Sequence, residues 1–169
     1  MRMLRALLPL LLLGMAILPG TGSAGASTPV PMDVYRAWLV NSNSGYCLAA
    51  SESPGEQPVV QTGCSGEVVD WSIVDLAGTD RHSIDTAYGP LRCVAARGTT
   101  ESQAVATDCW QGYDDQVWHI THNYSNNTYQ FRNVNSKLCL AARGTSMGTP
   151  AIQTTCGAWA DQWWWIYPE

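Results

Sequence analysis

Charged residues are scarce in this chain. Only 14% of its 169 residues are Asp, Glu, Lys or Arg, and acidic residues outnumber basic ones by 14 to 9. The net charge of −5 repels phosphates, and no Lys or Arg cluster is present to release counterions, so a nucleic-acid partner is disfavoured. The hydrophobic content of 46% is too high for a disordered chain and suits one globular domain.

Sustained helical periodicity is also missing. The apolar stretches are short, as in residues 38–40, 47–50, 59–61 and 71–74, and Gly, Pro, Asn and Ser separate them. No segment keeps a helical pattern over three turns. The sequence therefore predicts an all-β fold built from short strands.

Long apolar runs are absent except near the start of the chain. Residues 6–18 are almost entirely apolar, follow Arg2 and Arg5, and precede the small residues Ala24-Gly25-Ala26. This run is too short to cross a membrane, which takes about 20 residues. It has the parts of a secretory signal with a cleavage site. We expect residues 1–26 to be a signal peptide, 27–34 a short extension and 35–169 the domain of a secreted protein.

Signatures of metal binding and catalysis are lacking as well. No Cys-x-x-Cys pair occurs, and His119 and His122 are three positions apart, which places them on opposite faces of a strand. No Gly-x-Ser-x-Gly motif is present, and the acidic pair Asp114-Asp115 lies in a polar segment. We therefore expect no metal, no cofactor and no enzymatic activity.

The sequence does contain one motif three times. A Cys-(Leu/Val)-Ala-Ala segment recurs at intervals of 46 residues, a second cysteine follows it by 16 or 17 positions, and a tryptophan comes further on. Such periodicity indicates stacked copies of one small unit, each of about four strands, at about residues 35–77, 78–122 and 123–169. The matching positions are Cys47, Cys93 and Cys139, then Cys64, Cys109 and Cys156, then Trp71, Trp118 and Trp164.

Six cysteines in a chain with a signal peptide indicate three disulfides. Many pairings are formally available, but only pairing within each unit preserves the threefold repeat. This predicts the disulfides Cys47–Cys64, Cys93–Cys109 and Cys139–Cys156. In the chain-entropy model each one stabilises the fold by about 3 kcal/mol.

These motifs, together with Gln116-Val117-Trp118 and Gln162-Trp163-Trp164, resemble the ricin B-chain type repeat of β-trefoil lectins and carbohydrate-binding modules. The resemblance implies a β-trefoil in which six strands close a barrel and six form hairpins that cap one end. It also implies that Trp71, Trp118 and Trp164 pack in the core and that the glutamine beside each has mainly a structural role. Unit one departs from the pattern, because Val69 replaces the glutamine.

In galactose-binding members of this family, the usual site has an Asp two positions after the first cysteine, an aromatic residue two positions before the second, and an Asn or Asp just before the glutamine of Gln-x-Trp. Here the Asp positions are Ala49, Ala95 and Ala141, and the aromatic positions are Thr62, Thr107 and Thr154. Only the third element is kept, as Asp115 and Asp161. Either the sugar site is lost, or other residues hold the ligand. The candidates for the second case are Trp110, Tyr113, Asp115, Gln116, Trp159, Asp161, Gln162 and Trp163.

Arg97 and Arg143 stand in equivalent Arg-Gly-Thr turns of two units. Each can hold a carboxylate of a ligand, but bonding to loop carbonyls or to the aspartate of its own unit is the favoured role. Trp163 and Trp165 flank Trp164 and are expected on the opposite face of a strand.

The sequence as a whole predicts a secreted, non-catalytic, lectin-like protein whose partner is a glycan or polysaccharide. The alternative is a protein-binding β-trefoil, such as an inhibitor or a toxin-associated subunit, that has lost its sugar pocket. Neither alternative involves nucleic acid or insertion into a membrane after signal cleavage. The pattern of residues does not specify which glycan is bound.

Overall fold

The computed structural model describes residues 33–51, 53–76, 80–110 and 112–168. The predicted signal peptide at 1–26 lies outside these ranges. The described chain is all-β, as expected, with short single turns of 3-10 helix. The elements are β1 (Val34–Asn41), β2 (Cys47–Ala50), β3 (Gln57–Thr62), η1 (Glu67–Val69), β4 (Asp70–Asp75), β5 (His82–Thr86), β6 (Arg92–Ala95), β7 (Ser102–Gln103), β8 (Val105–Asp108), η2 (Asp114–Gln116), β9 (Trp118–Asn123), β10 (Thr128–Asn133), β11 (Cys139–Ala141), β12 (Ile152–Thr154), η3 (Ala160–Gln162) and β13 (Trp164–Pro168).

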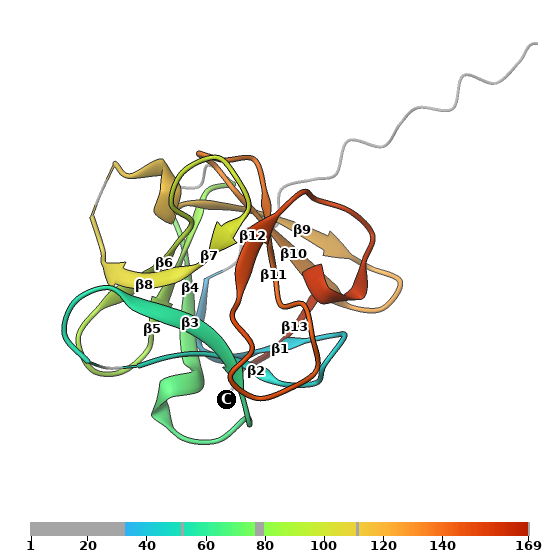
Figure 1. Cartoon of the computed structure of the whole chain (residues 1–169), viewed down its shortest axis with the longest axis horizontal. Helices are drawn as coiled ribbons and strands as arrows, with labels where there is room; N and C mark the ends of the chain where they lie inside the picture. The colour runs from blue at the N-terminus through green and yellow to red at the C-terminus, as the bar shows by residue number, and fades with distance from the viewer. Residues whose placement is uncertain (1–32, 52, 77–79, 111, 169) are drawn as a thin grey trace, which may run out of the picture.

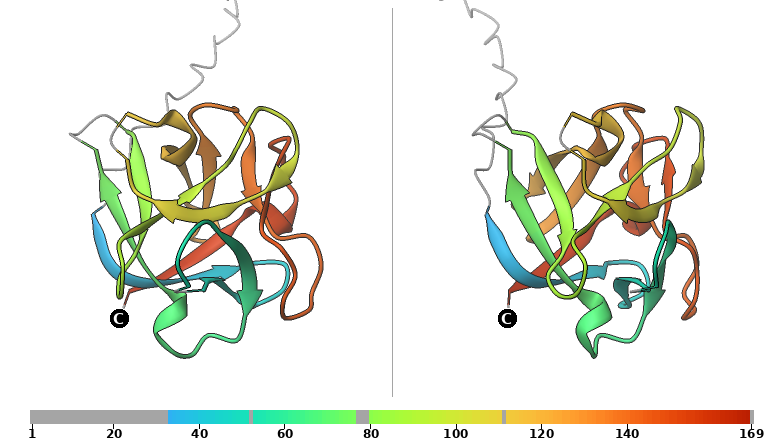
Figure 2. Two further views of the ribbon diagram at one scale, coloured as in Figure 1. Left: turned by 60° about the vertical axis from the view of Figure 1, so that its left-hand side comes forward. Right: turned by 90° about the vertical axis from the view of Figure 1, so that its left-hand side faces the viewer.

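Six strands close a barrel. The antiparallel pairings run from β1 to β4, β5, β9, β10 and β13, and β13 pairs with β1 again. Each unit contributes its first and last strand to this ring, which lies to the left of the hairpins in the right-hand view of Figure 2. Because the ring is closed, these strands leave no free edge for pairing with another chain.

Three hairpins cap one end of the barrel, arranged around a common centre in Figure 1. They are β2–β3, β6–β8 and β11–β12. At the centre, Val59 N donates to Ala104 O (3.0 Å), Ala104 N to Ala151 O (2.9 Å) and Ala151 N to Val59 O (2.9 Å). This cyclic triangle of main-chain hydrogen bonds relates the units by pseudo-threefold symmetry, and the fold is the expected β-trefoil.

The units differ in detail. Units one and three have the expected four strands, whereas the third strand of unit two is divided into β7 and β8 around Ala104. β1 begins one residue before the predicted start of the domain at 35, and β9 ends one residue beyond the predicted unit boundary at 122. These shifts leave the threefold arrangement intact.

The core is built around one tryptophan from each unit. Trp71, Trp118 and Trp164 are all 0% exposed. Their indole N–H groups donate to main-chain oxygens just after the first cysteine of the same unit, at 2.8, 3.0 and 3.3 Å. The indole is thus buried with its one polar group satisfied, as the resemblance implied. The accepting residues are Leu48, Val94 and Leu140.

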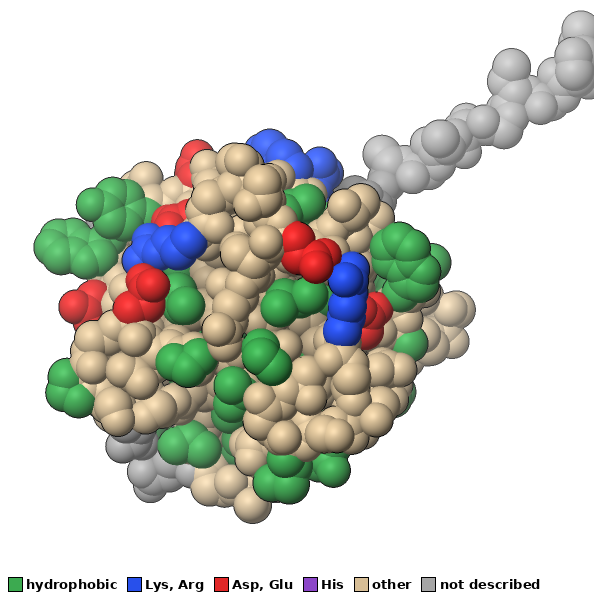
Figure 3. All heavy atoms as spheres, in the orientation of Figure 1, with side chains coloured by type: hydrophobic (Ala, Val, Ile, Leu, Met, Phe, Trp, Pro, Cys, Tyr) green, Lys and Arg blue, Asp and Glu red, His purple; other side chains and the backbone are tan. Residues whose placement is uncertain are grey.

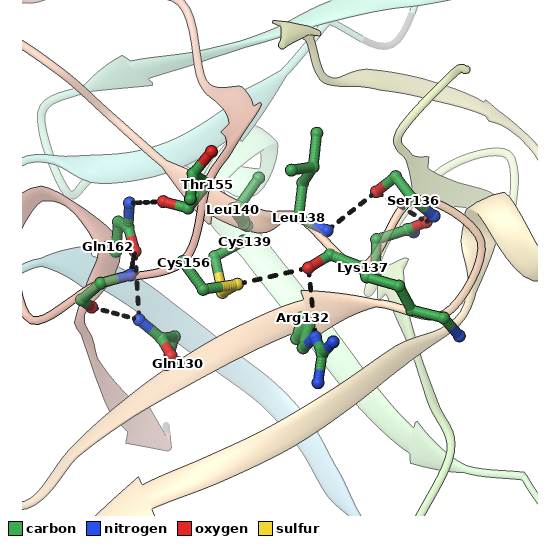
Figure 4. The surroundings of a disulfide bond; sticks show 12 residues. Gln130, Arg132, Ser136, Lys137, Leu138, Cys139, Leu140, Thr155, Cys156 and Gln162 are labelled. Carbon is green, nitrogen blue, oxygen red and sulfur yellow. Dashed lines mark hydrogen bonds between the residues drawn. A yellow bond between two sulfur atoms is a disulfide. The ribbon is translucent and has the colours of Figure 1, made fainter. Parts of the chain in front are cut away.

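All three disulfides join cysteines of the same unit, as predicted. Each one links the start of a cap hairpin to the loop that follows the hairpin. Figure 4 shows this for Cys139 and Cys156, where Cys156 Sγ lies 3.5 Å from Lys137 O. The disulfides therefore fix the loops that lead to η1, η2 and η3.

Two sets of titratable groups lie outside these loops. Asp85 Oδ1 is 3.1 Å from Cys93 Sγ, and burial raises the pKa of Asp85. Because both sulfur atoms are in the Cys93–Cys109 disulfide, these residues do not form a metal-ligand set. His119 Nδ1 is 2.7 Å from Asp80 O, whereas the ring of His122 stacks on Tyr129, so the two imidazoles have separate surroundings.

Within the part of the chain that the structure describes, no helix has the length and apolar character needed to cross a membrane.

Candidate functional site

Two arginines stand in matching turns of the cap. Arg97 follows β6 and Arg143 follows β11, and each precedes a glycine in the left-handed region, Gly98 at φ 72° and Gly144 at φ 102°. A side chain would strain the backbone there. Buried glutamines hold both turns, because Gln153 Nε2 donates to Arg97 O (2.7 Å) and Gln61 Nε2 donates to Gly144 O (3.3 Å). The main chain that carries each arginine is therefore held in a fixed position.

Arg97 is bound by carboxylates from two units. Its guanidinium pairs with Asp115 of its own unit and with Glu56 of unit one, the latter at 2.8 Å. It also donates to Thr107 Oγ1 at 3.4 Å. Burial by itself would lower the pKa of Arg97, but the hydrogen bonds and charges of Glu56 and Asp115 outweigh it and raise the pKa. The guanidinium is therefore a permanent cation clamped between two anions.

Arg143 has the equivalent surroundings in unit three. It donates to Thr154 Oγ1 at 2.8 Å and lies 3.2 Å from Glu101 of unit two. Its Nε is 3.6 Å from Asp161 Oδ2, beyond hydrogen-bonding distance. Arg143 is thus paired across the unit junction like Arg97, but more loosely with its own aspartate.

The two aspartates are fixed by their main chains. Asp115 O accepts hydrogen bonds from Ala96 N and Asn133 Nδ2, both at 2.8 Å. Asp161 O accepts from Ala142 N at 2.9 Å and from Asn41 Nδ2 at 2.8 Å. These bonds join the single turns η2 and η3 to the residues just before the arginines, Ala96 and Ala142. The aspartate side chain of each unit therefore lies close to the guanidinium of the same unit.

Exposed aromatic rings precede both of the single turns that carry the aspartates. Trp110 and Tyr113 precede η2, are 63% and 53% exposed, and have ring centroids 6.4 Å apart. Trp159 precedes η3 and is 60% exposed. Its ring packs over Gly157, where an added Cβ would lie only 2.3 Å from the indole. Glycine is therefore required at 157 for this ring position.

A hollow of about 310 Å³ lies at the unit-three group. It is lined by Arg143, Trp159 and Asp161. On the face drawn in Figure 3, basic side chains lie beside acidic ones in two separate places, with hydrophobic side chains nearby. We call the group of Glu56, Arg97, Thr107 and Asp115 junction site two, and the group of Glu101, Arg143, Thr154 and Asp161 junction site three.

Gln116 and Gln162 are placed differently from the other candidates, because both are buried. Gln116 accepts from Trp110 N (2.9 Å) and donates to Asp108 O (3.0 Å). Gln162 accepts from Gly157 N (2.8 Å) and donates to Thr155 O (2.7 Å), as Figure 4 shows for the Thr155 bond. These amides hold the aromatic loops, so we assign the two glutamines to the support of the sites. Trp163 is half-buried after η3 and does not line the hollow.

Replacing Gln116 with alanine is expected to lower the free energy of unfolding by about 1–3 kcal/mol, because Trp110 N–H and Asp108 C=O lose their partner. Denaturant unfolding followed by circular dichroism measures the change. Gln103→Ala is the control, since that side chain is exposed on β7. Equal stability of the two variants would contradict the structural role of Gln116.

Among the residues that the structure describes, unit one has no equivalent group. Ser51 stands at the arginine position and Val68, 41% exposed, at the aspartate position. Val69 replaces the glutamine and packs with Val40, Cys47 and Ala49 in a second apolar cluster. Unit three also supplies no carboxylate to unit one. Glu56 and Glu101 each lie eight positions before the second cysteine of their unit, but Gly148 occupies this position in unit three.

Sequence reasoning identified Asp115, Asp161 and Trp159, which the structure places beside the arginine of their own unit. It missed Glu56 and Glu101, which come from the preceding unit. Both glutamates lie eight residues before the second cysteine of their unit, so an alignment of the units shows them at one shared position. The positions of the usual Asp hold Ala49, Ala95 and Ala141, which are 3%, 0% and 0% exposed. These side chains are therefore not accessible to a ligand.

The closed barrel, the triangular cap and the in-unit disulfides define a disulfide-linked β-trefoil. Residues 37–164 match the model of the ricin-type β-trefoil lectin domain, and the chain belongs to this family.

Solved structures with the same fold include a designed threefold-symmetric protein, ThreeFoil. It is 22% identical, the match covers 79% of this chain and 99% of the design, and the TM-score is 0.70. A lectin from Polyporus squamosus, bound to the human-type influenza-binding epitope Neu5Aca2-6Galb1-4GlcNAc, is 18% identical over 80% of this chain and 49% of the lectin, with a TM-score of 0.62.

An exo-β-1,3-galactanase from Clostridium thermocellum is 19% identical over 80% of this chain and 30% of the enzyme, with a TM-score of 0.69. The comparison with curated proteins found no match. At these identities the solved structures establish the shared fold.

Proposed function

We propose that this is a secreted, non-catalytic carbohydrate-binding protein that holds glycans at junction sites two and three. The observation that carries the proposal is the hollow at junction site three, where a 60% exposed indole, Trp159, stands beside Arg143 and Asp161. An indole face stacks on the C–H face of a pyranose ring. A carboxylate accepts hydrogen bonds from ring hydroxyls, and a guanidinium donates to them.

Junction site three is the stronger of the two in this proposal. Asp161 is only loosely paired with Arg143, at 3.6 Å, so its carboxylate keeps hydrogen-bonding capacity for a sugar hydroxyl. In junction site two, Arg97 binds Asp115 and Glu56 closely. A ligand there has to displace stronger internal contacts.

Two sites on one rigid scaffold favour polymeric ligands. The cap fixes the separation of junction sites two and three, so a polysaccharide that engages one presents further residues to the other at a high effective concentration. Binding to a long glycan is therefore expected to exceed binding to its monosaccharide unit.

Calorimetric titration with a panel of oligosaccharides tests the proposal. Trp159→Ala is expected to weaken binding by about 2 kcal/mol, which is roughly 30-fold, because the buried contact with a large aromatic surface is lost. Trp110→Ala is expected to have a smaller effect. Tyr35→Ala is the control, because Tyr35 is 69% exposed on β1 in unit one, away from both junction sites.

Flat titrations with every sugar at millimolar concentration would remove the proposal. A protein partner whose binding depends on Trp159 and resists sugar competition would instead favour the alternative of a protein-binding β-trefoil. Export is tested separately, by sequencing the N-terminus of the protein recovered outside the cell, which is expected to begin at residue 27.

A further inference from the structure

The two junction sites share an excess of negative charge. In junction site three, Arg143 faces both Glu101 and Asp161. In junction site two, Arg97 faces Glu56 and Asp115 in the same way. Each site therefore has two carboxylates for one guanidinium, in a chain whose net charge is −5.

Building on the proposed function, we propose that the junction sites select sugars with a protonated amine, such as the 2-amino-2-deoxy units of deacetylated chitin. Trp159 and Asp161 line one hollow, so a bound pyranose places its ring substituents next to an indole face and a carboxylate together. An ammonium group is attracted to both, to the carboxylate by charge and to the indole by the cation–π interaction.

Acidic sugars meet the opposite situation. A uronate approaching Arg143 competes with Glu101, whose carboxylate already accepts a hydrogen bond from Thr154 Oγ1 and lies 3.2 Å from the guanidinium. It is also repelled by Asp161. The single positive charge of Arg143 thus faces two carboxylates, so the ligand encounters a net negative charge at the site.

The same arrangement recurs at junction site two with different aromatic residues. Tyr113 precedes η2 as Trp159 precedes η3, and Glu56 stands in place of Glu101. The carboxylate-to-guanidinium ratio is the same although the aromatic loop differs. The charge pattern is therefore shared by both sites. A polymer with an amine on each sugar residue can then meet the same charge at each site.

A matched pair of ligands tests the inference. Glucosamine oligomers and N-acetylglucosamine oligomers of equal length have the same ring and differ at the nitrogen, where acetylation removes the charge. At low salt and pH 6 the amine form is expected to bind about fivefold more tightly. This factor corresponds to about 1 kcal/mol, the interaction energy of one ion pair in a solvated site. The difference is expected to fall below twofold at about 0.5 M salt, because screening weakens exposed charge pairs.

Glu101→Gln locates the effect. This variant is expected to reduce the ratio of the two affinities, amine form over N-acetyl form, by at least half. Asp114→Asn removes the same charge from a side chain that pairs with Arg81, and it is expected to preserve the preference. Circular dichroism of both variants confirms that they are folded.

Equal or tighter binding of the N-acetyl form at low salt, or tighter binding of a galacturonate oligomer, would overturn the inference. If that binding still depended on Trp159, the proposed function would stand. Polylysine binding as tightly as the glucosamine oligomer would also overturn the inference, since the sites would then recognise charge without the sugar. Absence of binding to all sugars would overturn both proposals.

Discussion

Replacing Trp164 with alanine is expected to lower the free energy of unfolding by about 3–5 kcal/mol. The indole is 0% exposed, packs at the centre of the barrel and donates to Leu140 O at 3.3 Å. Its removal leaves a large cavity and an unsatisfied carbonyl. The loss is a large part of the 5–15 kcal/mol that stabilises a typical domain. Denaturant unfolding of both proteins measures it.

Trp159→Ala is the matched control for that experiment. It removes the same side chain from the same unit, but from a position that is 60% exposed, so the expected change in stability is within about 0.5 kcal/mol. Equal losses for the two variants would mean that the division into core and site tryptophans is incorrect.

Removal of the Cys139–Cys156 disulfide by a double substitution to alanine is expected to cost about 3 kcal/mol in unfolding free energy. The cysteines are 17 positions apart, and opening the loop increases the entropy of the unfolded chain. The loop also carries the backbone that leads to Trp159, so looser sugar binding is expected together with lower stability.

The Cys47–Cys64 disulfide serves as the comparison, because it closes a loop of the same separation in a unit without a junction site of its own. Its removal is expected to cost a similar free energy while changing sugar affinity by less than the Cys139–Cys156 removal. An unchanged midpoint of denaturation for both double variants would show that the disulfides do not stabilise the fold.

The fold was predictable from the sequence because its determinants repeat. The first and second cysteines and the tryptophan recur in register, and a unit of about 46 residues is too small to bury its own apolar face. Three copies closing around Trp71, Trp118 and Trp164 satisfy all of these requirements at once. The disulfide pairing follows from the same symmetry.

The site was predictable only in part. Asp115 and Asp161 were identified from their positions in the repeat, and Trp159 from its place between the second cysteine and the core tryptophan. The contributions of Glu56 and Glu101 depend on how one unit packs against the next, which a search within single units does not show. The division of unit two's third strand into β7 and β8 likewise depends on its contact with β12, which pairs with β7.

Sugars are proposed to bind at junction sites two and three, and not at the corresponding positions of unit one. Titration of ¹⁵N-labelled protein with a binding oligosaccharide, followed through the indole N–H signals, tests this proposal most directly. The Trp159 signal is expected to shift first and the Trp110 signal to follow at higher concentration, while the signals of buried Trp71 and of the Ser51 and Val68 amides stay unchanged. Shifts confined to Ser51 and Val68, with Trp159 and Trp110 unchanged, would contradict it.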